Sequence, residues 1–254
     1  MGLVARNSAN AADFDGTNDY MATGAGLTGA ADAKSGVLSC WVRVDTSPAS
    51  VSRLLFGSTT VGGGVGTDRF NFSYNTAGND HFSFIGANSA GTDILHIASS
   101  AVAIDPDGTT WYHVLSSWDL ATPGARHIYI NDVANLTEIT FTDDTIDYTL
   151  ADWSAGARTD AAQKFNGGMF DLYFKMGAYL DFSVEANRRL FIGADGKPVD
   201  LGASGTNPGL GTPEVFQHLS NGEAVANFAT NRGGGGNFSI TGTLETAPTS
   251  PSDQ

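Results

Sequence analysis

Four oxygen-bearing side chains crowd a short stretch near the start of the chain and could bind a cation. They belong to Asp13, Asp15, Asn18 and Asp19. Carboxylate and amide oxygens are the ligands that Ca²⁺ prefers, but an EF-hand loop starting at Asp13 would need a Glu at its twelfth position, and none is there. Short Asp and Asn side chains also close turns by accepting bonds from nearby backbone N–H groups. We therefore expect neither a cofactor nor a structural dependence on Ca²⁺, and if Ca²⁺ binds, this cluster is its site.

Three aromatic side chains are candidates for stacking against a sugar ring. They are Trp118, Trp153 and Tyr173. A sugar contact requires an exposed aromatic face on a sheet or in a loop, and Trp153 has loop-like neighbours. The alternative for all three is the hydrophobic core, which is where we expect Trp41 and Trp111.

Neither the glutamates nor the histidines have the spacing of a catalytic or zinc site. A retaining glycosidase needs two carboxyl groups about 5–5.5 Å apart. The five glutamates are far apart in sequence, and none belongs to a Glu-x-Asp-x-x-Glu motif: Glu138, Glu185, Glu214, Glu223 and Glu245. The 5 histidines form no His-x-His or His-x₃-His pair. We therefore predict that the protein is not an enzyme and has no catalytic residues.

The elements that would position these residues are strands joined by turns. The chain has 32 Gly, and Asp makes up most of its 27 acidic residues, which favours turns over helix surfaces. Leu38, Cys40, Val42 and Val44 alternate and predict a strand with one buried face. Strands also follow at 111–118 and before Asn131-Asp132, a pair typical of a hairpin turn.

A later segment predicts a further strand of strict period two. Its apolar face would consist of Gly168, Phe170, Leu172, Phe174 and Met176, with Asp171, Tyr173 and Lys175 opposite. Many short strands separated by turn residues are typical of an all-β, antiparallel β-sandwich. One short helix is expected, capped by Ser183 and ending before Gly193.

Charge excludes some partners. The net charge of −14 repels phosphate backbones, so we expect no nucleic acid, and no apolar run is long enough to insert into a membrane. The start of the chain also lacks an apolar stretch of signal-peptide length.

Four segments together resemble laminin-G-like, concanavalin A-like sandwich domains. They are DFDGTNDY at 13–20, Trp41 within the strand 37–44, WYHV at 111–114 and FNGGMFDLY at 165–173. The resemblance implies a jelly roll of two antiparallel sheets, a fold that serves lectins, adhesion modules, enzymes and structural proteins alike. It therefore leaves the function open.

The remainder of the chain resembles a C-terminal extension that such sandwiches carry in virion proteins of tailed phages. The matching segments are 187–192, 196–202, 229–233, 237–242 and 249–253. We accordingly predict an N-terminal arm at 1–12, a sandwich at 13–182, and at 183–254 a short helix with a loop-rich extension packed on the sandwich or on neighbouring subunits.

Two functions follow as hypotheses. The first is a noncatalytic structural protein of a tailed-phage virion, made in the host cytoplasm, in which it is an outer capsid decoration protein rather than a tail component. The second is a carbohydrate-binding, lectin-like module that adheres to host glycans. Residues 1–12 and 244–254 carry few large apolar side chains to offset the entropy of ordering them, so we expect capsid proteins or other copies of the chain, in a trimer, to hold them.

Overall fold

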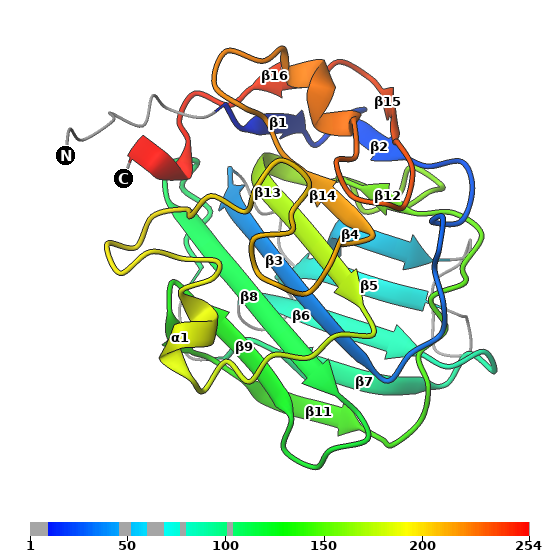
Figure 1. Cartoon of the computed structure of the whole chain (residues 1–254). Coiled ribbons are helices and arrows are strands. Elements are labelled where there is room, and N and C mark those ends of the chain that lie inside the picture. Colours follow the sequence, from blue (N-terminus) through cyan, green and yellow to red (C-terminus); the bar gives the residue numbers. More distant parts are fainter. Residues whose placement is uncertain (1–9, 46–51, 60–68, 77–79, 101–103, 254) are drawn as a thin grey trace.

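Two eight-stranded antiparallel sheets pack face to face (Figure 1). The computed structural model describes residues 10–45, 52–59, 69–76, 80–100 and 104–253. Sheet A has the order β10-β9-β8-β3-β13-β1-β16, with β14 also paired to β13. Its strands are β1 (Ala12–Asp15), β3 (Ser35–Val44), β8 (Trp111–Asp119), β9 (Arg126–Ile130), β10 (Val133–Ala134), β13 (Asn166–Met176), β14 (Val215–Gln217) and β16 (Glu245–Thr246).

Sheet B has the order β11-β7-β6-β5-β4-β12-β2-β15. Its strands are β2 (Tyr20–Ala22), β4 (Ser52–Thr59), β5 (Arg69–Asn75), β6 (His81–Ala87), β7 (Asp93–Ala98), β11 (Thr137–Phe141), β12 (Ser154–Ala155) and β15 (Ser239–Thr241). The helical elements are short: α1 (Glu185–Arg188), η1 (Val225–Ala229) and η2 (Pro251–Asp253). None of the described helices has the length and apolar character needed to span a bilayer. The predicted all-β sandwich is confirmed.

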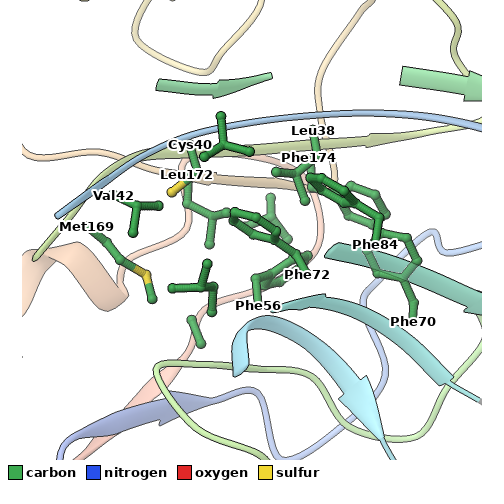
Figure 2. Close-up of a cluster of buried hydrophobic side chains, with 14 of the residues drawn as sticks. Leu38, Cys40, Val42, Phe56, Phe70, Phe72, Phe84, Met169, Leu172 and Phe174 are labelled. Carbon is green, nitrogen blue, oxygen red and sulfur yellow. The ribbon is translucent and has the colours of Figure 1, made fainter. Parts of the chain in front are cut away.

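The core between the sheets follows from period-two alternation. Leu38, Cys40 and Val42 point inward from β3 and meet Phe72 and Phe84 of sheet B (Figure 2). The residues between them on β3 face the other side of sheet A, where Trp41 packs with Trp111 in a second buried cluster. Both tryptophans are buried as predicted, with exposed fractions of 2% and 1%.

A β-bulge interrupts the alternation of β13, and here the predicted face is wrong. The register against β3 shifts between Phe170 and Tyr173, and Asp171 has a φ of 50°. The additional residue turns Phe170 outward, while Met169 before the bulge and Leu172 after it both point into the core (Figure 2). Strict alternation cannot include an inserted residue, so both predicted core positions before the bulge, Gly168 and Phe170, lie on the opposite face, beside Trp111.

The predicted extension is built into both sheets. β14 and β16 belong to sheet A, and β15 belongs to sheet B. The yellow part of the chain, which precedes β14, and the orange part around β14 run over the side of sheet A that faces away from sheet B (Figure 1). There Phe182, Phe191 and Leu201 pack on Tyr173 and Leu115 of sheet A. The residues beyond 182 therefore enlarge the sandwich and add a second apolar layer to it.

The C-terminal segment is held by its own chain. Leu244 and Ala247 are buried, β16 pairs with β1, and the Trp111 Nε1–H donates to Thr249 Oγ1 at 3.0 Å. Residues 244–253 thus have partners within the chain itself, and the expectation that neighbouring subunits also hold the two ends stays a prediction. Of the predicted arm 1–12, residues 1–9 lie outside the described residues, and Ala12 already begins β1.

Two local predictions have opposite outcomes. Asn131 and Asp132 adopt φ values of 49° and 66° between β9 and β10, as a two-residue hairpin turn requires. The helix α1, however, has Val184 at its N-cap position with no side-chain cap. The helix begins one residue later than predicted, and the hydroxyl and the N–H of Ser183 both donate to Asp181.

Candidate functional site

The predicted cation ligands do come together, in a cleft at the end of β1. Asp13, Asp15, Asn18 and Asp19 line it together with Thr243 and Glu245, around about 330 Å³. We call this the acidic cleft. β16 brings in Glu245, which pairs directly across from Asp13 in sheet A. The sequence could not reveal this partner, which lies more than 200 residues further along.

One carboxylate oxygen of each aspartate in the acidic cleft already bonds to a protein group. Asp15 Oδ1 accepts the N–H groups of Thr17, Asn18 and Asp19 at 2.7, 2.9 and 3.1 Å, which is the turn closure considered as the alternative to a metal. Desolvation raises the pKa of Asp15, but these three bonds outweigh it and lower that pKa below its ordinary value.

Asp13 and Asp19 are engaged as well. Asp19 Oδ1 accepts the Thr243 N–H at 2.7 Å, and Asp13 Oδ1 lies 2.6 Å from the Arg43 guanidinium. Burial raises the pKa of Asp13, opposed by Arg43 and reinforced by the neighbouring carboxylates. Among the described residues, no three His, Cys, Asp or Glu side chains are arranged to hold a metal ion. The acidic cleft is thus a network of turn and strand contacts.

The three aromatic residues predicted to bind sugar are all buried, and that prediction is wrong. Trp118 points inward from β8, and its Nε1–H donates to the Tyr148 hydroxyl at 3.1 Å. The Trp153 ring stacks on Phe56 inside the sandwich, with 5.3 Å between ring centroids. Tyr173 does face away from sheet B, but the extension covers it.

A different pocket opens where the extension meets the bulge of β13. It encloses about 430 Å³, within the usual range for small-ligand sites. We call it the extension pocket. Its lining consists of Phe170, Asp171, Pro198, Val199, Asp200, Leu201, Gly202, Phe216, His218, Ser220, Asn221 and Ser252. The apolar members are mostly buried, whereas Asp200, Ser220 and Asn221 are exposed.

An Asp–His pair forms one wall of the extension pocket. Leu172 of β13 lies opposite Gln217 of β14. Because the two strands are antiparallel, the next pair along the register is Asp171 and His218. His218 Nδ1 lies 2.5 Å from Asp171 Oδ1. The bulge puts Asp171 on the outer side of sheet A, where the histidine is, in a left-handed conformation that non-glycine residues seldom adopt. Strained backbone of this kind is frequent at binding sites.

Aromatic rings fix the orientation of this histidine. The imidazole of His218 stacks on Phe216 at 5.4 Å and meets Phe170 edge-on at 6.0 Å. Burial raises the pKa of Asp171, and the hydrogen bond with His218 opposes that shift. With Nδ1 bound to the carboxylate, the other ring nitrogen, Nε2, is the one free to bond a ligand, since the side chain of His218 remains 25% exposed.

The cations around the extension pocket are engaged elsewhere. Arg232 pairs with Glu223 and donates from Nε to the carbonyl of His218 at 3.2 Å. Lys197 donates to the carbonyl of Ser252 at 2.8 Å. Neither side chain lines the pocket. An apolar floor with carboxylate, amide, hydroxyl and imidazole groups above it can bind a polyhydroxylated ligand with an apolar face.

Sequence reasoning missed every polar residue of this pocket. One signal was present: Asp171 is an acidic residue between two large apolar neighbours, Phe170 and Leu172. Its partner His218 lies 47 residues away, and only strand pairing brings the two together.

Solved structures with a related fold share little sequence with this chain. A proposed carbohydrate-binding protein from Bacteroides ovatus aligns with a TM-score of 0.57 and 15% identity, over 95% of this chain and 61% of its own. This chain thus spans about three fifths of that protein. Domains LG4–5 of the mouse laminin α1 chain give a TM-score of 0.44 at 14% identity, over 69% of this chain and 43% of their own.

Tailspike protein 2 of a bacteriophage of Escherichia coli O157:H7 gives a TM-score of 0.46 at 12% identity, over 89% of this chain and 31% of its own. No curated protein is significantly similar in sequence. A family model does match, that of the concanavalin A-like lectin/glucanases superfamily, over residues 15–174. This match covers more than half of the chain, and the resemblance seen in the sequence is confirmed: the protein belongs to the concanavalin A-like lectin/glucanase superfamily.

Proposed function

We propose that this protein is a noncatalytic, lectin-like module that binds a glycan in the extension pocket. The observation that carries the proposal is the lining of that pocket, an apolar floor beneath Asp171, Asp200, His218 and Asn221. Sugars combine apolar C–H faces with hydroxyl groups, so a pocket of this kind offers both contacts. The family and the Bacteroides ovatus structure support a role in carbohydrate binding.

The absence of catalysis is part of the proposal. Glycoside hydrolysis needs a carboxylic acid free to protonate the glycosidic oxygen and a second carboxylate across the bond. In the extension pocket Asp171 is buried and bound to His218, and Asp200 Oδ1 accepts the Gly202 N–H at 2.8 Å. Both carboxylates are thus used to hold the walls of the pocket.

A glycan array followed by calorimetric titration of the best ligand tests the proposal. We expect His218→Ala and Asn221→Ala to weaken binding at least about fivefold, since each removes a polar contact worth roughly 1–3 kcal/mol. His96→Ala is the matched control, because His96 is a half-buried histidine on sheet B. The bound glycan should be recovered intact, with no release of reducing sugar.

Two results would contradict this proposal. Loss of binding in His96→Ala but not in His218→Ala would move the site to sheet B. Reducing-sugar release that disappears when one carboxylate is replaced would make the protein an enzyme.

The more specific role predicted from the sequence, that of an outer capsid decoration protein of a tailed phage, is a second proposal beside glycan binding. The net charge of −14 favours it, because such a surface suits the outside of a particle better than an interior filled with DNA. A decoration protein that binds glycans would serve adhesion. Mass spectrometry of purified particles tests the virion location, and light scattering of the isolated protein tests the proposed trimer. A monomer absent from particles would contradict both.

A further inference from the structure

The extension pocket is negatively charged, and this bears on which sugars it can accept. Asp171 and Asp200 contribute two carboxylates, and the lining has no lysine or arginine. His218 Nδ1 lies 2.5 Å from Asp171 Oδ1, so one proton held between these two groups cancels at most one of the two carboxylate charges. The exposed carboxylate of Asp200 then leaves the lining with a net negative charge.

Acidic sugars need a binding pocket with a positive charge. A sialic acid, a uronic acid or a sulfated sugar carries an anion that is bound by charge-assisted hydrogen bonds, most often from arginine. Arg232 is neutralised by Glu223, and the ammonium group of Lys197 is bound to the Ser252 carbonyl. An anionic sugar would therefore enter a pocket that repels it, in a protein whose net charge is −14.

Resting on the proposed function, we infer that the extension pocket selects uncharged sugars and rejects their acidic counterparts. Asp200 and Asn221 stand at the exposed rim, where their oxygens accept hydrogen bonds from sugar hydroxyls. Phe170 and Phe216 form the floor on which an apolar sugar face rests. Selectivity comes from the lack of a lysine or arginine in the pocket lining as much as from the contacts that the lining makes with the sugar.

The test uses the full-length protein and an array of neutral glycans, each paired with its sialylated, uronic or sulfated form. We expect neutral forms to bind at least about fivefold tighter, the ratio that one charge contact in water is worth. Asp200→Asn keeps the acceptor oxygen that bonds to the Gly202 N–H while removing the charge. It should therefore raise the affinity for acidic forms relative to neutral ones.

Asp195→Asn is the matched control. Asp195 is also exposed and also accepts a backbone N–H two residues on, from Lys197 at 3.2 Å, but it lies outside the pocket lining. It changes the total charge equally, so the ratio of acidic to neutral binding should stay as in the wild type.

The outcomes separate the two proposals. Acidic forms that bind as well as neutral ones, or whose binding is lost in Lys197→Gln, would overturn the inference while leaving a glycan-binding protein. An equal change of the ratio in Asp195→Asn and Asp200→Asn would also overturn it, because the charge effect would then be general. If no glycan of either kind binds, the proposed function fails and the inference fails with it.

Discussion

A buried histidine should make the stability of this protein fall steeply below neutral pH. His113 lies on β8 with no exposed surface, 2.9 Å from Ser39 Oγ through its Nε2 and beside the Trp41 ring at 4.7 Å. Its Nδ1 has no hydrogen-bond partner among the described residues. Burial lowers the pKa of His113 from 6.5 to about 3, opposed only weakly by the carboxylate of Asp132.

The magnitude follows from the two pKa values. Because the folded pKa lies below that of the unfolded chain, the unfolded state binds the additional proton as the pH falls below about 6.5. The stabilising contribution is complete above that pH and decreases as the pH falls toward 3. At about 1.4 kcal/mol per pH unit, the loss at pH 5 is about 2 kcal/mol.

Denaturant unfolding at pH 7.5 and pH 5.0 measures this loss. The variant Ser39→Ala/His113→Leu removes the titrating ring together with the hydroxyl that it would leave unpaired. Its fixed packing cost cancels between the two pH values, as do the contributions of other titrating groups. We expect the wild type to lose about 2 kcal/mol more than the double variant between the two pH values.

The single variant Ser39→Ala is the control, since it keeps the ring and should keep the steep pH dependence. Equal losses in the wild type and the double variant would refute the reasoning, because the proton would then bind the folded and unfolded states equally well.

Three further predictions concern packing, charge and metal. Gly168→Ala should destabilise the protein by about 1–3 kcal/mol, because the new Cβ would lie 2.5 Å from the Trp111 ring, whereas Gly234→Ala makes only ordinary contacts and should cost much less. Thermal melting compares the two variants, and equal melting temperatures would show that the indole moves aside. Glu245→Gln should stabilise the protein by roughly 0.2–1 kcal/mol at pH 7, because the carboxylate of Glu245 on β16 lies directly opposite that of Asp13 on the neighbouring strand β1. A lower free energy of unfolding for the variant would mean that Glu245 makes a favourable contact. Chelator should leave the melting temperature unchanged, since protein groups bond the carboxylates of the acidic cleft, and a drop of many degrees would reveal a bound ion that only the native state holds.

Short-range sequence patterns were sufficient to predict the sandwich but not the β-bulge in β13. The alternation on β3 and the hairpin turn at Asn131-Asp132 depend on neighbours within a few residues, so both could be predicted. The bulge at Asp171 depends on the register with β3 and on the pairing with β14, which no local pattern records.

Residue type alone could not separate sugar-binding aromatics from core aromatics. Tyr173 shows why: it alternates outward from β13, and on a bare sandwich it would face solvent. In this chain Phe191 and Phe216 pack edge-on against its ring at 5.3 and 6.4 Å. The prediction that it binds sugar was wrong because the extension turns this face of sheet A into core.

The same covering explains where a ligand can still enter. The extension buries the outer face of sheet A around Tyr173, and it leaves an opening at the bulge, where Asp171 leaves the regular strand geometry. One wall of that opening comes from β13 and the others from residues 198–221 and Ser252, so neither the sandwich nor the extension forms the pocket alone. A sandwich of this family without the extension would lack His218, Asp200 and Asn221 together. The binding specificity that we propose is therefore a property of the junction between the two parts, not of the family fold.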